Sequence, residues 1–310
     1  MAKARAVKPV KTSAIAFTGV VTRTHGRHHF VSAPDGSLYE AHRRGKKSDV
    51  VVGDIVDCTQ PQGEVVAIER IHDRENLLYR SDEWRIKELA SNLTLVAVVI
   101  ASRPSFNPWF VWKASIAAKT AGIDLVIIRN KSDLAEKKED IESFCDLMKN
   151  DCGAQVIHTS AEKHPEDTLK VLSDKFAGQR VLLVGQSGMG KSTILNVLCP
   201  QAQAKTREFS EALDLGKQTT TTTAMYTCEL NGKKTEIIDS PGFQEFGLAH
   251  VTATDIQEAM PDIVRHIDGC RFYNCTHTNE PGCSVKKAVE AGEINPERYA
   301  FYRALISQLQ

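Results

Sequence analysis

The nine residues from Gly185 to Thr193 constrain the fold of this chain more than any other feature of the sequence. They follow a short apolar run at 180–185 and precede a helix-forming run that stops near Pro200. A glycine-rich loop between a strand and a helix turns its backbone N–H groups toward a phosphate chain, and the helix N-terminus adds positive potential. The pattern therefore predicts a phosphate-binding loop in an α/β domain.

Each position of this G-x4-G-K-S/T loop has an expected task. Lys191 would contact the terminal phosphates, and the Ser192 hydroxyl would ligate magnesium. The other positions would cradle the nucleotide phosphates: Gly185, Gln186, Ser187, Gly188, Met189, Gly190 and Thr193. The pattern alone arises by chance in unrelated proteins, so the flanking strand and helix are what favour a phosphate loop here.

From about residue 90 the chain alternates between strand-like and helix-like segments. Asn107 is placed to cap a helix, Pro108 takes its first position and Gly122 follows its last turn. The segment 223–230 alternates in polarity, and Asn231-Gly232 predicts a hairpin that makes one strand antiparallel. Five nearly continuous apolar runs predict parallel strands buried on both faces: 93–101, 124–130, 155–160, 180–185 and 235–239.

Three further motifs stand at the ends of these predicted strands. Asp239-Ser240-Pro241-Gly242 fits D-x-x-G, in which the Asp239 carboxylate would hold magnesium through water and the Gly242 N–H would sense the terminal phosphate. Asn130-Lys131-Ser132-Asp133 fits N-K-x-D, and Thr159-Ser160-Ala161 is the usual companion loop beside the base. Each motif alone is weak, because Asp-capped turns are common. Four elements at four strand ends together predict a nucleotide site.

The N-K-x-D motif predicts that the base is guanine. An Asp133 carboxylate accepts hydrogen bonds from guanine N1–H and from the exocyclic amine, and adenine offers neither donor. An ATP-dependent kinase is therefore a distant alternative. The order of the motifs is unusual, because Asn130 precedes Gly185 by 55 residues. This order indicates a circular permutation, with the old termini joined between Ala161 and Arg180, and it couples whatever follows Gly242 to the loop that responds to GTP hydrolysis.

Four potential metal ligands follow the D-x-x-G motif. The spacing Cys270-x4-Cys275-x-His277-x5-Cys283 suits a closed, structural, tetrahedral Zn²⁺ site within a small helical module. The alternative is a cysteine-rich core loop with a surface histidine. The other five cysteines are scattered, and we expect them to be core or surface fillers.

The first 75 residues predict a basic tail and a small barrel. Short β-rich segments with turns between them favour an OB-like antiparallel barrel at 13–75, after a disordered tail at 1–12. Residues 1–50 hold ten Lys/Arg and three acids, although the whole chain has 39 of each. This asymmetry indicates either a polyanionic partner or a solvated tail. Phe17, Phe30 or Tyr39 would either stack on bases beside Arg43, Arg44, Lys46 and Lys47 or fill the barrel core.

Length and composition fit this division of the chain. The 310 residues suffice for two or three domains, and 42% hydrophobic residues exclude wholesale disorder. We expect an α/β GTPase domain at 85–248 and a zinc-binding domain at 249–310. No apolar run approaches 18 residues and no signal peptide is evident, which predicts a soluble, cytoplasmic protein without membrane contact. We also expect it to be a monomer.

A β-barrel, a permuted GTPase and a Cys-Cys-His-Cys module in this order resemble the RsgA (YjeQ/YloQ) family of ribosome small-subunit biogenesis GTPases. The resemblance covers nearly the whole chain after residue 12, and 237–248 and 275–289 are especially family-like. It implies GTP hydrolysis stimulated by the small ribosomal subunit, contact with rRNA and assembly factors, and a late checkpoint in subunit maturation. The competing hypothesis is a nucleotide-gated RNA-binding protein in which hydrolysis is incidental.

The catalytic residue is the least certain part of the expectation. Many GTPases orient water with a glutamine directly after D-x-x-G, but Phe243 stands there. Family members usually have G-R-H-T-T-T where this chain has Gly216-Lys217-Gln218-Thr219-Thr220-Thr221. The resemblance therefore makes Gln218 the catalytic candidate in place of the family histidine, and Thr221 the candidate among 219–223 for a second magnesium ligand. Otherwise, Gln218 is a solvated loop residue and rRNA supplies the catalytic group.

Overall fold

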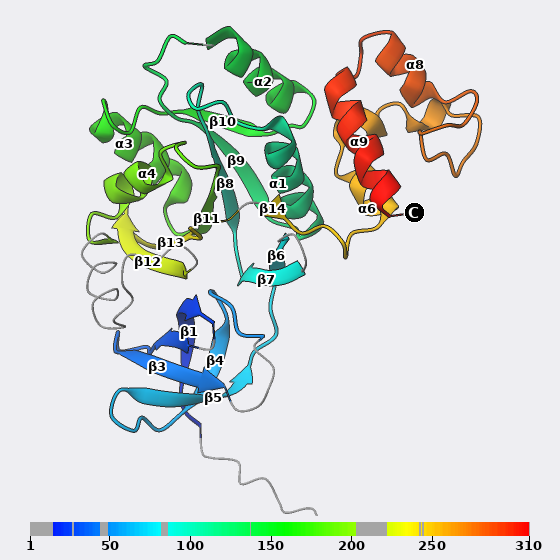
Figure 1. The fold of residues 1–310 in the computed structure, drawn as a ribbon. Helices are drawn as coiled ribbons and strands as arrows, with labels where there is room; N and C mark the ends of the chain where they lie inside the picture. Colours follow the sequence, from blue (N-terminus) through cyan, green and yellow to red (C-terminus); the bar gives the residue numbers. More distant parts are fainter. Residues whose placement is uncertain are drawn as a thin grey trace, which may run out of the picture.

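The computed structural model places three structural units along the chain: a barrel, a larger α/β unit and a helical C-terminal unit (Figure 1). The barrel lies at one end of the α/β sheet, the helices α6 and α9 lie beside α1, and α8 lies beyond α9. The residues that the structure describes are 15–26, 28–43, 49–81, 86–136, 138–202, 222–241, 243 and 245–309.

The N-terminal unit is a closed five-stranded barrel, which confirms the OB-like prediction. Its order is β1-β2-β3-β5-β4, with β4 pairing back to β1, and only the β3–β5 pair is parallel. Its core includes Val21, Val31, Val56 and Ile68. The strands are β1 (Ile15–His25), β2 (His28–Ser32), β3 (Leu38–Arg43), β4 (Ile55–Thr59) and β5 (Val65–Ile71).

The aromatic residues of the barrel favour packing over base stacking. Phe30 is only 9% exposed, so its ring offers no face to a base. Phe17 and Tyr39 pack on each other with ring centroids 5.5 Å apart, and both are partly buried against the barrel core.

The apolar run at 50–56 does not form one continuous strand. Gly53 has φ = 98° and turns the chain so that β4 begins only at Ile55.

The α/β unit contains the predicted doubly wound sheet. Its strand order is β10-β9-β8-β11-β13-β12, and all neighbours are parallel except β12 and β13. The turn between those two has φ = 49° at Asn231 and 72° at Gly232, as a tight hairpin requires. The strands are β8 (Leu95–Ile100), β9 (Asp124–Arg129), β10 (Gln155–His158), β11 (Arg180–Val184), β12 (Thr223–Leu230) and β13 (Lys233–Asp239).

Helices cover both faces of this sheet (Figure 1). Val96 and Val98 of β8 face the core formed with α1 and α2, whereas Leu95 and Ala97 face the core formed with α3 and α4. Because both faces are buried, the strand is apolar throughout. The helices are α1 (Pro108–Thr120), α2 (Lys138–Asn150), α3 (Pro165–Phe176) and α4 (Lys191–Leu198).

The C-terminal unit packs on α1. This helix begins as predicted, because the Asn107 side chain caps it by accepting a hydrogen bond from the Trp109 N–H at 2.9 Å. The ring of Phe301 lies 5.4 Å, between centroids, from the ring of Trp112. The Arg298 guanidinium lies 5.7 Å from the centre of the Trp112 ring. The elements are α6 (Ala253–Glu258), α7 (Pro261–Val264), η1 (Ile267–Gly269), α8 (Ser284–Glu290) and α9 (Pro296–Gln308).

Two strand pairings join the units. β12 continues the large sheet into the barrel, because Arg23 of β1 pairs with Ala224. A small sheet combines the hairpin β6 (Leu77–Ser81) and β7 (Ile86–Ser91) with β14 (Glu245–Phe246), directly after the D-x-x-G motif. The sequence did not predict either pairing.

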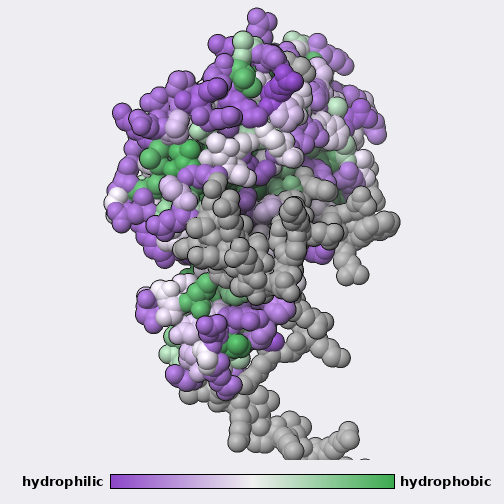
Figure 2. Space-filling model, turned by 60° about the vertical axis from the view of Figure 1, so that its left-hand side comes forward, coloured by the Kyte–Doolittle hydropathy of each residue, from purple (hydrophilic) through white to green (hydrophobic). Residues whose placement is uncertain are grey.

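The surface is largely polar on the face drawn in Figure 2, where hydrophobic residues form small, separate areas and the barrel is a smaller lobe. Across the described ranges, no helix is both long and apolar enough to cross a lipid bilayer.

Candidate functional site

The phosphate loop lies between β11 and α4, as the sequence predicts. Gly190 precedes α4 with φ = 95°, and Gly188 has φ = 79°, which are left-handed conformations that favour glycine. A Cβ at Gly185 would lie 2.4 Å from the Val99 carbonyl oxygen, so only glycine fits against β8 there. Ser187 and Ser192 are exposed, whereas Met189 is buried and anchors the loop.

Lys191 and Asp239 are partly buried near each other beneath this loop. The Lys191 Nζ donates to the carbonyl oxygens of Gly185 at 2.6 Å and Gln186 at 3.1 Å. Burial lowers the pKa of Lys191, and the Asp239 charge opposes that shift. Burial raises the pKa of Asp239, and Lys191 opposes that shift. The Asp239 Oδ1 is buried and accepts no hydrogen bond from the described residues, so it is available to a cation or to a water molecule that a cation holds.

The N-K-x-D motif follows β9, and its Asp133 side chain is exposed at the mouth of a small pocket. The Ser160 hydroxyl donates to Asp133 Oδ1 at 2.5 Å, which lowers the pKa of Asp133 and keeps the carboxylate charged. Lys131 has φ = 56°, and its Nζ donates to the Arg103 carbonyl oxygen at 3.1 Å. The pocket has a volume of about 160 Å³, and Lys163 and Gly190 also line it.

Asn130 joins three of the four predicted motifs. Its Nδ2 donates to the Met189 carbonyl oxygen in the phosphate loop at 3.0 Å. Its Oδ1 accepts from the Thr159 hydroxyl at 3.1 Å and from the Ala161 N–H at 3.2 Å. The three loops therefore form one continuous hydrogen-bonded edge of the sheet, where ligands of open α/β sheets bind.

Several predicted site residues lie outside the described residues. These include Gly242 of D-x-x-G, the catalytic candidate Gln218 and the magnesium candidate Thr221, together with the basic residues Arg44, Lys46 and Lys47. Phe243 is described, and its side chain is 8% exposed. Its ring packs on Phe246 at 4.7 Å and on Phe110 at 5.9 Å between centroids, so it serves as a core residue.

The four predicted metal ligands lie together in the C-terminal unit. The ligand atoms of Cys270, Cys275, His277 and Cys283 all fall within 4.8 Å of one another. The Cys270 and Cys283 sulfurs are 3.9 Å apart, and the His277 Nδ1 is 3.4 and 3.5 Å from them. Tetrahedral zinc with ordinary bond lengths separates two sulfurs by about 3.8 Å, and sulfur from nitrogen by about 3.6 Å. The arrangement therefore fits a Cys₃His metal site.

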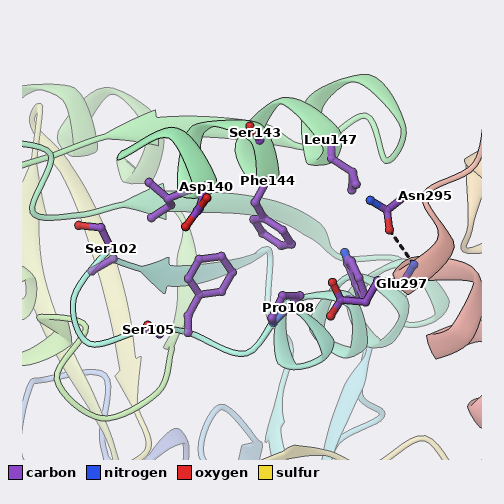
Figure 3. Close-up of a pocket in the computed structure, with 13 residues that line it drawn as sticks. Ser102, Ser105, Pro108, Asp140, Ser143, Phe144, Leu147, Asn295 and Glu297 are labelled. Atoms are coloured by element: carbon purple, nitrogen blue, oxygen red, sulfur yellow. Dashed lines mark hydrogen bonds between the residues drawn. The ribbon is translucent and has the colours of Figure 1, made fainter. Parts of the chain in front are cut away.

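A second hollow lies away from the nucleotide motifs, between α1, α2 and the start of α9 (Figure 3). It measures about 390 Å³, and Phe144 points from α2 toward Pro108 while Asn295 and Glu297 close the far side. Its described lining includes two carboxylates, Asp140 and Glu297, and no lysine or arginine. A phosphate chain needs positive or N–H donor groups, so this hollow does not suit a nucleotide.

Comparisons with known proteins agree with this geometry. The RsgA GTPase family model matches residues 71–249. A curated relative from Bordetella pertussis, the small ribosomal subunit biogenesis GTPase RsgA, is 44% identical over 94% of this chain and 95% of its own. The relative of the same name from Neisseria meningitidis is 43% identical, covering 94% of this chain and 92% of its own.

Solved structures share the fold. YjeQ from Thermotoga maritima matches 94% of this chain and 98% of its own, with 24% identity and a TM-score of 0.67. YloQ, described as a circularly permuted GTPase, covers 97% of each chain with 22% identity and a TM-score of 0.64.

Proposed function

This chain belongs to the RsgA GTPase family, and from that premise we propose that it hydrolyses GTP as a late maturation factor of the small ribosomal subunit. The names of its curated relatives support the subunit as partner. The observation that carries the nucleotide assignment is the Asn130 side chain, because it bonds the phosphate loop to both base-side loops. A cytoplasmic location, contact with rRNA and assembly factors, and a monomeric state belong to the same proposal.

The described residues suggest how GTP would bind. The phosphates would take the loop from Gly185 to Thr193, where Lys191 would exchange its two carbonyl partners for phosphate oxygens. Guanine would lie beside Asp133, whose carboxylate Ser160 keeps charged. Lys131, Ser132 and Ala161 would complete the base site.

Magnesium fits the remaining groups of the site. The unpaired, buried Asp239 Oδ1, the exposed Ser192 hydroxyl and Thr221 would hold it, with Gly242 beside the terminal phosphate. The ion would neutralise charge on the β- and γ-phosphate oxygens.

Zinc is the metal that the Cys₃His cluster favours. Three thiolates and one imidazole are ligands that suit zinc, and their ligand atoms all lie within 4.8 Å of one another. Burial lowers the pKa of His277, which keeps its imidazole neutral as a metal ligand must be. All four positions belong to protein side chains, so the ion would have a structural role.

Hydrolysis should need help from the ribosome. Phe243 lies in the core at the position where many GTPases place a water-orienting glutamine. Gln218 is the candidate within this chain that would replace it, once subunit binding places its side chain at the terminal phosphate.

The test is single-turnover GTP hydrolysis with and without small ribosomal subunits, with Lys191→Ala as the control for the phosphate loop. A large, subunit-dependent acceleration that Lys191→Ala abolishes supports the proposal. Unchanged rates together with GTP-dependent subunit binding would favour the competing hypothesis, a binding protein with incidental hydrolysis. Equal affinity for ATP and GTP would contradict the guanine site.

A further inference from the structure

Three side chains on the outer surface of the barrel converge on one point. Phe30 of β2 pairs with Glu40 of β3, and His29 pairs with Ala41. One step further along this antiparallel ladder, His28 lies opposite His42. Because alternate residues of a strand share a face, Glu40 and His42 point to the same side as His28. The opposite side carries the buried His29 and Ala41.

The three ligand atoms are close enough to share one ion. The Glu40 Oε1 is 2.8 Å from His28 Nδ1 and 3.4 Å from His42 Nε2. The three ligand atoms lie within 4.8 Å of one another, and the two rings are 5.8 Å apart between centroids. Around tetrahedral zinc, neighbouring nitrogen and oxygen ligands are separated by about 3.3 Å. Small rotations of exposed side chains would bring all three separations to this value.

We propose that His28, Glu40 and His42 form a second metal site, which takes a divalent transition-metal ion such as Zn²⁺ or Ni²⁺. Two imidazoles and one carboxylate are ligands that these ions prefer, whereas Mg²⁺ and Ca²⁺ prefer oxygen alone. The side chains of His28, Glu40 and His42 are 52%, 31% and 49% exposed, so an ion reaches them from solvent and keeps positions for water. The site is chemically distinct from the sulfur-rich C-terminal cluster.

The strands hold two of the three ligands in place without the ion. His28 and Glu40 already form a hydrogen bond, so little ordering is needed when the ion binds. The neighbouring His25 of β1 pairs with His28, but its Nδ1 bonds the Thr222 hydroxyl at 2.9 Å, so we leave it out of the ligand set. The bound ion would cross-link β2 to β3 near the C-terminal end of β3, which directly precedes residues 44–48.

The simpler interpretation is a surface ion pair between Glu40 and a histidine, and it predicts no metal affinity. The metal site and the simple ion pair are distinguished by titrating Ni²⁺ into tag-free, full-length protein whose C-terminal cluster already carries one equivalent of zinc. Calorimetry measures the stoichiometry, elemental analysis confirms that the zinc is retained, and NMR follows the histidine ring signals.

We expect one equivalent of Ni²⁺ to bind, with paramagnetic broadening of the His28 and His42 ring signals first. His28→Ala, His42→Ala and Glu40→Gln should each weaken binding by about 10–100-fold or more, since even loss of a residue that only supports a ligand has that effect. The matched control is His158→Ala, which removes another exposed histidine beside a glutamate, 3.8 Å from Glu142. Its affinity should equal that of the wild type.

Three outcomes would overturn the assignment. One is the absence of a second equivalent of bound metal at millimolar Ni²⁺. Another is a second equivalent that persists with unchanged affinity in both His28→Ala and His42→Ala, because the ion would then lie elsewhere. The third is loss of metal in His158→Ala to the same extent as in the ligand variants.

Discussion

The Asp133 carboxylate accepts a hydrogen bond from the Ser160 hydroxyl, which lowers the pKa of Asp133 more than any other neighbour does. We predict that Asp133→Asn weakens GDP binding by roughly 10–150-fold, which corresponds to the loss of a charged hydrogen bond of about 1.5–3 kcal/mol. The same variant should gain affinity for XDP, because xanthine presents a carbonyl where guanine has its amine. Competition binding with both nucleotides measures the change. Asp146→Asn, an exposed acid on α2, is the control, and equal loss in both variants would contradict the role.

The lowered pKa of Asp133 also fixes the sign of a pH effect. An acid whose pKa is lowered stays charged until the pH falls through that value, so the preference for GDP over ADP should persist from pH 7 to pH 5. Ser160→Ala removes the hydrogen bond and lets the pKa rise toward its ordinary value. The pH below which the GDP/ADP affinity ratio falls should then be higher than in the wild type. An identical profile in both proteins would show that Ser160 does not tune Asp133.

At this scale the sequence predicted residue types well and contacts poorly. The glycines, Lys191, Asp133 and Asp239 follow from motif spacing, because the chemistry of a nucleotide site requires those side chains. The bond from Asn130 to Met189 does not follow, because it links residues 59 positions apart. His28, Glu40 and His42 were also missed, since their proximity depends on the register of β2 and β3.

Among the elements, α7 and α9 are joined by a buried ion pair. Arg298 donates to both oxygens of Asp262 at 2.7 and 3.0 Å, and the two side chains are 1% and 2% exposed. Removing one partner leaves a buried, unpaired charge, so we predict that Asp262→Ala destabilises the C-terminal unit by about 3–5 kcal/mol. Native-state hydrogen exchange of α9 measures the change. Lys149→Ala, which breaks an exposed pair with Asp146, should change stability by less than about 1 kcal/mol.

The metal cluster ties η1 to α8, so its loss should be felt locally. We predict that Cys275→Ala releases about one equivalent of zinc and loosens the C-terminal unit, because metal binding and folding are coupled in small modules. Nucleotide affinity should be largely unchanged, since the cluster contributes nothing to the described lining of the base pocket. Elemental analysis and GDP titration measure both effects, and Cys58→Ala in the barrel is the control. Metal-replete wild type without zinc would contradict the site.

Long elements could be predicted from the sequence because their signals are local. The cap of α1 at Asn107 and the apolar runs of β8 and β11 lie within the elements themselves. The two-residue strand β14 has no such signal, and its partner β6 lies more than 160 positions earlier, at Arg80 and Ser81 against Phe246 and Glu245. Tertiary contact alone selects that pairing.

The circular permutation has a consequence for the whole molecule. The D-x-x-G motif leads directly into β14, which pairs with β6 between the barrel and the α/β unit, and then into the C-terminal unit. Phe246 packs on α1, the helix that also contacts α9. A change at the terminal phosphate can therefore reach both flanking units through packed elements. The domain limits at 13–75, 85–248 and 249–310 stay predictions.

Thr222 is the first described residue after the segment that contains Gln218, and it contacts the barrel. Its hydroxyl lies 2.9 Å from the His25 Nδ1 of β1. Thr223 then pairs with Thr24, so the end of this segment is fixed to the barrel. Because Gln218 lies only four residues before Thr222, we expect docking of the barrel on rRNA to influence its position.

This link leads to a prediction about catalysis. A glutamine amide both donates to and accepts from water, so we expect Gln218 to orient the attacking water molecule that the buried Phe243 cannot. We predict that Gln218→Ala keeps GTP binding and subunit binding but loses most of the subunit-stimulated hydrolysis, by about 100-fold or more if it acts as glutamine does in other GTPases. Stopped-flow nucleotide binding, subunit co-sedimentation and single-turnover hydrolysis separate these steps. Gln155→Ala, at an exposed position of β10, is the control. Full stimulation in Gln218→Ala would assign the catalytic group to rRNA instead, and loss of subunit binding would make Gln218 a docking residue.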